Sequence, residues 1–215
     1  GVRCFQRHGR GQLRKSNGDC VNGIWRYDVL EGEAVYTSRE EGWRFSGTFV
    51  GGKWNGPGKI ELEGGDTWEC QWAGGEVVTG SGVHTTVKGD MYMGGCVASQ
   101  GNRKVPCRTG HGRLKWREGD QVETKFRDGK ALDGAKGVVK FRNGAIFFGQ
   151  LRGARPHGQV LYGEIYLSSA RAVDARMVMH NPIAKLDEMA RNLLWYKGDF
   201  QLGLPHGTGL VKYRD

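Results

Sequence analysis

Apolar and polar residues alternate with a period of two along most of the chain, in short runs joined by glycine-rich connections. In the last stretch, Tyr196–Asp215, Gly198 and Phe200 follow the opening aromatic at alternate positions, and a second alternating run passes through Val211 and Tyr213. Alternation on both sides of a glycine-rich connection is typical of a β-hairpin. This stretch therefore predicts two antiparallel strands, and we interpret His206–Gly209 as the turn between them.

The same unit recurs along the chain at a spacing of about 23 residues. The interval from the second turn glycine to the next closing glycine is identical in five copies: Gly11 to Gly18, Gly58 to Gly65, Gly82 to Gly89, Gly112 to Gly119 and Gly137 to Gly144. Since a lone hairpin is only marginally stable in water, the units must stack to bury an apolar face. The sequence predicts an all-β fold, an elongated single-layer solenoid of stacked antiparallel β-hairpins.

The glycines also predict how the two strands of a hairpin pair. If the strands pair antiparallel around the turn, Phe49 lies opposite Gly58 and Phe200 lies opposite Gly209. An aromatic ring then covers the bare backbone of a glycine on the neighbouring strand. The glycines near the turn are expected to supply positive φ values.

The pattern aromatic-x-Gly-x-aromatic-x-x-Gly-x-x-His/Asn-Gly-x-Gly resembles the MORN repeat (membrane occupation and recognition nexus). The match is close at Tyr196–Gly209 and Phe45–Gly58 and looser elsewhere. Two of the departures are Cys70, which stands where the first strand glycine belongs, and Cys96, which replaces the second aromatic. The resemblance covers nearly the whole chain apart from one segment close to the C-terminus.

Three regions follow from this pattern. Residues 1–167 are interpreted as an array of about seven repeats, with the first truncated and several degenerate. Residues 195–215 form the final repeat. Residues 168–194 break the pattern and predict one inserted α-helix, with Asn181 as N-cap and Pro182 at the first helical position. Its apolar stripe packs either on the repeats or on a partner, and the sequence leaves both open.

Charge and composition extend the picture. The net charge of +9 suggests an acidic partner: nucleic acid such as RNA, an anionic membrane, or acidic protein tails such as those of tubulin. Charge that only protects solvated strand edges is the interpretation that we favour over such a surface. The 37 glycines fall in register, which argues against a disordered low-complexity chain. The candidate surface for an acidic partner lies in the denser basic region and comprises Arg103, Lys104, Arg108, Arg113, Lys115 and Arg117.

The motifs of common catalytic and metal sites are missing from the sequence. The five cysteines form no CxxC pair, and no group of Cys and His has the spacing of zinc ligands. No Gly-rich turn is followed by the Lys-Ser or Lys-Thr of a phosphate loop, and no GxSxG motif marks a nucleophile. We therefore expect no cofactor, no metal and no catalytic residue. Direct membrane binding ranks low, since no polybasic cluster adjoins an apolar anchor.

The resemblance implies a non-catalytic scaffold that docks partner proteins within a larger assembly, with a cilium, axoneme or other cytoskeletal structure as the favoured location. An accessory subunit of a mitochondrial or other organellar complex or ribosome, and a targeting module of a larger enzyme, are the alternatives. The oligomeric state stays open. The partner is expected in a groove of aromatic and glycine positions, whose exposed rings are Phe45, Phe49, Trp68, Trp72, Tyr92, Phe126, Phe147, Tyr196 and Phe200.

Overall fold

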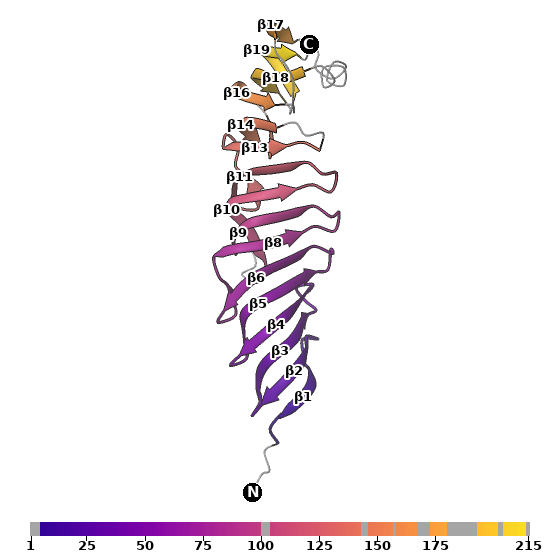
Figure 1. Ribbon diagram of the computed structural model, residues 1–215. Helices are drawn as coiled ribbons and strands as arrows, with labels where there is room; N and C mark the ends of the chain where they lie inside the picture. The colour runs from indigo at the N-terminus through magenta and orange to yellow at the C-terminus, as the bar shows by residue number, and fades with distance from the viewer. Residues whose placement is uncertain are drawn as a thin grey trace. The chain divides into compact units, whose positions relative to one another are not determined.

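The computed structural model describes residues 5–99, 104–142, 146–156, 158–166, 173–179, 193–201 and 204–213. The chain divides into two compact units, residues 1–108 and 109–215. The boundary falls inside strand β10 (Pro106–Lys115). Both units consist of antiparallel strands (Figure 1), and the described residues contain no helix. The predicted all-β class is confirmed over this part of the chain.

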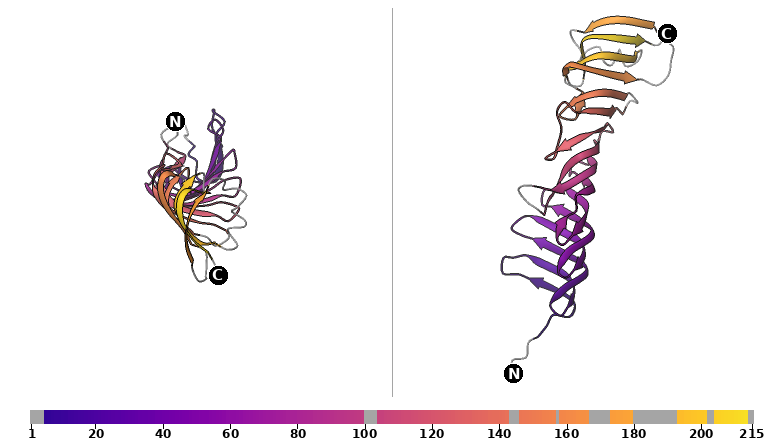
Figure 2. Two further views of the ribbon diagram at one scale, coloured as in Figure 1. Left: turned by 90° about the horizontal axis from the view of Figure 1, so that it is seen from above. Right: turned by 90° about the vertical axis from the view of Figure 1, so that its left-hand side faces the viewer.

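The first unit is an open sheet in which strands pair antiparallel in chain order. The two views of Figure 2 show that this sheet is twisted. Its short β7 pairs only with the end of β6, so that β8 continues the sheet beside β6. The strands are β1 (Gly9–Arg14), β2 (Cys20–Arg26), β3 (Val29–Ser38), β4 (Trp43–Val50), β5 (Lys53–Leu62), β6 (Thr67–Ala73), β7 (Glu76–Val77), β8 (Gly80–Thr85) and β9 (Met91–Ala98).

The second unit repeats this arrangement, with short β12 and β15 at the ends of β11 and β14. Its strands after β10 are β11 (Gln121–Arg127), β12 (Lys130–Ala131), β13 (Lys136–Lys140), β14 (Ile146–Arg152), β15 (Arg155–Pro156), β16 (Gly158–Tyr166), β17 (Val173–Met179), β18 (Leu193–Gln201) and β19 (Leu204–Tyr213). Strand β17 pairs with β19 and lies within residues 168–194, where only a helical insertion was expected. The predicted helix from Asn181 lies outside the described residues.

The hairpin turn does not lie at the position predicted from the sequence. Gly51 and Gly52 form the tip of the β4–β5 hairpin with φ values of 58° and 76°, the two positive values of a type I′ turn. Paired positive φ values also occur at Tyr27-Asp28, Gly74-Gly75, Asp128-Gly129 and Gly153-Ala154. The motifs that we interpreted as turns, such as His206–Gly209, lie inside strands.

The register differs accordingly. Phe49 pairs with Trp54, and Gly47 pairs with Gly58. Likewise Phe200 pairs with Pro205, and Gly198 with Gly209. The predicted pairing of each phenylalanine with a glycine is wrong, because the tip turn lies closer to the phenylalanine and a register shift follows it. Glycine faces glycine across the hairpin.

The β4–β5 hairpin is bent at these glycines. The rings of Phe45 and Trp54 stack with centroids 3.9 Å apart and planes 1° apart. Trp54 pairs with Phe49, and a straight strand would separate Phe49 from Phe45 by about 13 Å. The register shift between Gly47 and Phe49 is of the kind that bends a strand. The tip of the hairpin therefore folds back over the aromatic face of its own sheet.

A second kind of turn, at the end of the strands away from the hairpin tips, connects one hairpin to the next. Gly65, with φ of 90°, donates its backbone N–H to the Leu62 carbonyl at 2.8 Å, and Leu62 donates to the Asp66 carbonyl at 2.8 Å. Together these bonds make a type I turn with a glycine bulge. The Asp66 carboxylate accepts the backbone N–H of Val87 at 3.0 Å, and so links this turn to the next repeat. Equivalent hydrogen bonds run from the backbone N–H of Arg39 to the Asp19 carboxylate and from the backbone N–H of Arg142 to the Asp120 carboxylate.

Candidate interaction surface

The predicted aromatic contact residues form the core of the sheet. The seven whose side chains are described lie at 0–4% relative exposure: Phe45, Phe49, Trp68, Trp72, Tyr92, Phe126 and Phe147. Trp54 from the folded tip covers Phe45, and the His84 ring covers Trp68. The expected exposure of these rings is not found. A partner would reach them only if the side chains packed on them moved away. The side chains of Tyr196 and Phe200 are not among those that the structure describes.

Two of the predicted basic residues are built into the first unit. Lys104 places its Nζ 4.8 Å from the centroid of the Trp54 ring and donates to the Gly75 carbonyl. Arg108 lies 5.2 Å from the ring centroid of Tyr92. Burial lowers the pKa of both groups. Both side chains are half-buried and make these contacts within the first unit.

The remaining members of that predicted surface belong to the second unit, apart from Arg103, which is not described. Arg113 forms an ion pair with Glu123 at 2.6 Å, and Lys115 and Arg117 are exposed. Residues 1–108 contain 14 Lys and Arg against 12 Asp and Glu, so they carry +2 of the net charge of +9, and residues 109–215 carry the other +7. Most of the excess positive charge therefore belongs to the second unit.

His84 is the centre of a buried polar chain that no sequence pattern predicts. Its Nδ1 accepts from Arg108 Nη2 at 2.8 Å, and its Nε2 lies 3.0 Å from Asp66 Oδ2. Because a guanidinium only donates, Nδ1 must be unprotonated, and Nε2 carries the hydrogen donated to Asp66. The ring also stacks on Trp68 at 4.4 Å. Burial and, to a smaller extent, the charge of Arg108 lower the pKa of His84, so the folded state favours the neutral imidazole ring.

Cys70 and Cys96, the two departures from the repeat pattern, pack against each other. Their Sγ atoms are 3.3 Å apart, and both side chains are buried. A Cβ built on Gly82 would lie 2.6 Å from one sulfur and 2.9 Å from the other, so the pair covers this glycine as rings do elsewhere. The hydrogen bond between the two thiols, with burial, raises the pKa of Cys70.

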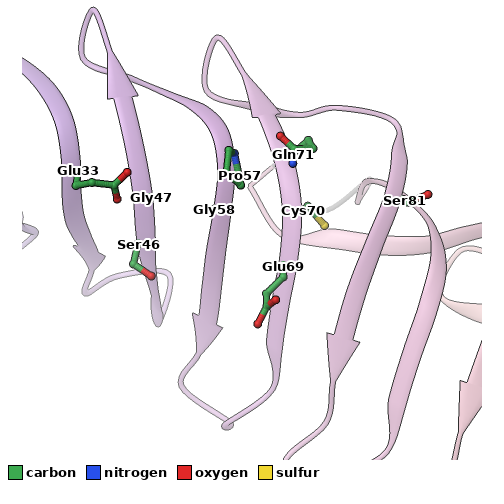
Figure 3. A pocket seen from close by; sticks show the side chains of 9 residues that line it. All are labelled: Glu33, Ser46, Gly47, Pro57, Gly58, Glu69, Cys70, Gln71 and Ser81. Carbon is green, nitrogen blue, oxygen red and sulfur yellow. The ribbon is translucent and has the colours of Figure 1, made fainter.

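An open groove lies on the face of the first sheet opposite the aromatic layer. It has a volume of about 530 Å³ and crosses β3, β4, β5, β6 and β8 (Figure 3). Gly47 and Gly58 contribute only their backbone to the floor of the groove, since a side chain at either position would point into the aromatic layer. The other lining residues are Glu33, Ser46, Pro57, Glu69, Cys70, Gln71 and Ser81. The sequence signals these positions only indirectly, as the residues that alternate with the aromatic row.

The polar side chains of this groove are available to a ligand. Within the described part of the chain, no hydrogen bond or ion pair engages the side chains of Ser46, Glu69, Gln71 and Ser81. Lys59, the cross-strand neighbour of Glu69, instead pairs with Glu61 at 2.9 Å. Glu33 accepts one bond, from Thr48 Oγ1 at 2.6 Å. The groove therefore presents two carboxylates and several neutral polar groups to solvent.

Apolar side chains continue the same face beyond the groove. Val83 is the cross-strand neighbour of Glu69, and Met93 is the neighbour of Val83. Cross-strand neighbours lie on the same side of a sheet. Met93 is 52% exposed and Met91, two residues earlier, is 40% exposed. The face thus changes from acidic to apolar between β6 and β9.

Other kinds of site find no support in the described residues. They contain no group of three or more His, Cys, Asp or Glu side chains placed to hold a metal ion. Nor do they contain a helix of the length and apolarity that a membrane span requires.

The geometry defines a class of protein, an open all-β protein built from bent hairpin repeats with a buried aromatic face and an accessible polar face. The model of the MORN repeat family matches the chain at four places, residues 6–20, 22–40, 45–67 and 196–215. The chain therefore contains MORN repeats, and the prediction made from the glycine and aromatic pattern is confirmed.

Two further comparisons add little. No curated protein matches the chain. Among solved structures, the chain is similar to a point mutant of the TCP10 domain of Danio rerio CPAP, with 10% identity, 93% coverage of this chain, 88% coverage of that chain and a TM-score of 0.41. At that TM-score the similarity supports no argument about function or partner.

Proposed function

We propose that this protein is a non-catalytic interaction module that docks a partner protein on the polar face of its first unit. The observation that carries the proposal is the groove over β3–β8, whose side chains of Ser46, Glu69, Gln71 and Ser81 have no intramolecular partner within the described chain. MORN repeats are generally non-catalytic, and they suggest a scaffold or interaction role. The proposal moves the docking site from the buried aromatic row to the opposite face.

The resemblance to MORN scaffolds favours a ciliary, axonemal or other cytoskeletal assembly as the setting. The positive second unit supports the alternative of an organellar complex or a ribosome, since exposed Lys115 and Arg117 there suit RNA or an acidic subunit. A third possibility is that the repeats are the targeting module of a larger enzyme.

A native pull-down at low and moderate salt tests the docking function. The bait is compared with a groove variant carrying Ser46→Arg and Ser81→Arg, which fills the hollow with long side chains at partly or fully exposed positions. We expect specific proteins to be retained at moderate salt by the original chain and lost from the variant. The matched control places the same two arginines in exposed turns outside the groove, at Ser16 and Glu40.

The identity of the retained proteins decides the setting. Axonemal or cytoskeletal proteins support the favoured assembly. Ribosomal or respiratory components, or RNA lost as salt rises, support the organellar alternative. Retention of the same proteins by bait and groove variant would place docking elsewhere on the chain, and retention of none by the bait would contradict the docking function.

A further inference from the structure

We infer that the groove on the first unit binds an extended basic segment of a partner protein, one that carries two Lys or Arg residues followed by an apolar residue. This inference rests on the proposed docking function and specifies the chemistry of the partner. It comes from the order of side chains across the polar face: a carboxylate on β3, a carboxylate on β6, the half-buried Val83 on β8 and the exposed Met93 on β9.

The sign of the charge comes from the two lining carboxylates. Glu33 and Glu69 are both exposed, and the groove is lined by no Lys or Arg. Glu69 has no ion-pair partner in the described chain, because Lys59 is bonded to Glu61. A cation on the partner completes this arrangement, whereas nucleic acid or an anionic membrane would bring phosphates toward the carboxylates. The groove therefore favours a positively charged ligand, although the chain as a whole carries a net charge of +9.

The apolar end of the face sets the direction and composition of the segment. Val83 follows Glu69 across the sheet, and Met93 follows Val83. Met93 is 52% exposed, so an apolar side chain on the partner would bury it and gain hydrophobic stabilisation. A segment that is basic along its whole length would leave this end unused.

The strand spacing sets the interval between these groups. Glu33 on β3 and Glu69 on β6 are three strands apart, or about 14 Å across the sheet, and they are offset by two residues, or about 7 Å, along the strands. Their separation is therefore about 16 Å, and Met93 on β9 is two strands further than Glu69, or about 10 Å. An extended segment covers these distances with basic residues about five positions apart and the apolar residue about three positions later. A helix, about 10 Å across, is too wide for a hollow of about 530 Å³ over the same length.

Selection of short peptides tests the inference without knowledge of the natural partner. The probe is a displayed library of random peptides of about 12 residues, selected in parallel on the full chain, on a Glu33→Gln/Glu69→Gln variant and on a Glu40→Gln/Glu118→Gln control. Each variant loses the same two charges, and the amide that replaces the Glu33 carboxylate can still accept the Thr48 hydroxyl. The two control residues are exposed and lie outside the groove.

We expect peptides with the basic, basic, apolar order to be enriched on the full chain and on the control, and to bind the groove variant about tenfold more weakly. A loss of about threefold per exposed ion pair gives that figure. Binding should weaken as salt is raised, and a Val83→Thr/Met93→Gln variant should retain the preference for basic residues but lose the apolar one. Enrichment of acidic or uncharged peptides, equal binding to the groove variant, or no enrichment at all would overturn the inference.

The pull-down separates this failure from failure of the docking function. If the natural partners are retained equally by the full chain and the Glu33→Gln/Glu69→Gln variant, but are lost from the arginine-filled groove, docking stands and the basic segment is wrong. If the full chain retains no partner, the proposed function fails as well.

Discussion

Replacement of Gly58 by alanine tests whether the aromatic layer needs a bare backbone beneath it. Gly58 does not have a positive φ, so alanine can adopt its backbone conformation and only space is at issue. A Cβ at this position would lie 2.5 Å from two ring carbons of Phe45 and 3.0 Å from Cδ1 of Trp72. Carbon atoms in favourable contact are about 3.5–4.0 Å apart. The Phe45 ring must therefore move by about 1 Å.

The surroundings of Phe45 leave it little room to do so. Its ring stacks on Trp54 at 3.9 Å and meets Trp72 edge-on at 5.3 Å, and the side chain is fully buried. Overpacking of this kind costs about 1–3 kcal/mol, and replacement of a glycine returns about 0.4–1 kcal/mol by restricting the unfolded chain. A net loss of about 1–2 kcal/mol lowers the melting temperature of a unit of this size by about 4–8 °C.

Thermal unfolding followed by near-ultraviolet circular dichroism measures this effect, because the signal reports tryptophan packing. Gly64→Ala is the matched control, since a Cβ there meets no atom within 4 Å and its φ is not positive. A double-mutant cycle with Phe45→Leu should show non-additivity, because a smaller side chain makes room for the new methyl group. Equal melting temperatures for Gly58→Ala and Gly64→Ala would refute the idea that the rings pack on the glycines.

Two further predictions concern the polar links between repeats. The pKa of His84 is lowered from its ordinary value of 6.5, so near and below that pH the unfolded chain binds the proton more readily than the folded chain, and the free energy of unfolding falls. The denaturant concentration at the unfolding midpoint should therefore drop as the pH is lowered from about 7.5 to about 5.5. The His84→Gln variant should show a smaller drop. An unchanged pH profile in the variant would argue against the neutral ring bonded to Arg108 and Asp66. Asp120→Ala removes the oxygen that accepts the Arg142 backbone N–H at 2.8 Å. Loss of this hydrogen bond should lower the local opening free energy by about 1 kcal/mol and so speed hydrogen exchange of the Arg142 amide about fivefold. Asp120→Asn keeps an accepting oxygen and should retain part of the protection. Exchange at the same rate in all three proteins would mean that the bond contributes nothing.

The repeat and its strands could be predicted from the sequence because they depend on local chemistry. Alternation reports one buried face, and glycines at fixed spacing report positions where a side chain does not fit. At Gly58 that inference is correct in kind, since ring atoms of Phe45 occupy the space of a Cβ. The ring that covers it comes from Phe45 in a diagonal position, however, and not from Phe49, the residue predicted to pair with Gly58.

The position of the turn could not be decided in the same way. Gly51-Gly52 and Asn55–Gly58 are both glycine-rich, and either can reverse a chain. The deciding feature is the bend, which requires one glycine-rich segment to stay in the strand so that the tip can fold back. The bonds from Gly52 N to Leu30 O and from Gly75 N to Trp54 O hold successive tips in place at 3.0 Å each. These contacts join residues more than 20 positions apart, so no local pattern announces them.

The candidate site was missed for a related reason. Aromatic residues dominate the sequence pattern, and a single-layer sheet would expose them on one side, so they were the natural choice for a binding surface. Folding of the tips reverses that choice: Phe45 and Trp72 lie at 2% exposure or less, and the alternate positions Ser46 and Gln71 face solvent. A signal was present, since residues one position from a buried row must point to the other face.

This reversal determines which substitutions can separate folding from binding. A change at Phe45 or Trp72 removes a buried ring at a cost of about 3–5 kcal/mol, so any loss of partner binding would follow from loss of the fold. Changes at Glu69 or Gln71 alter exposed side chains that make no hydrogen bond or ion pair within the described residues. Surface substitutions of that kind usually shift the free energy of unfolding by less than about 0.5 kcal/mol. A binding defect at these two positions with an unchanged melting temperature would therefore assign function to the polar face, where a defect in the aromatic row could not.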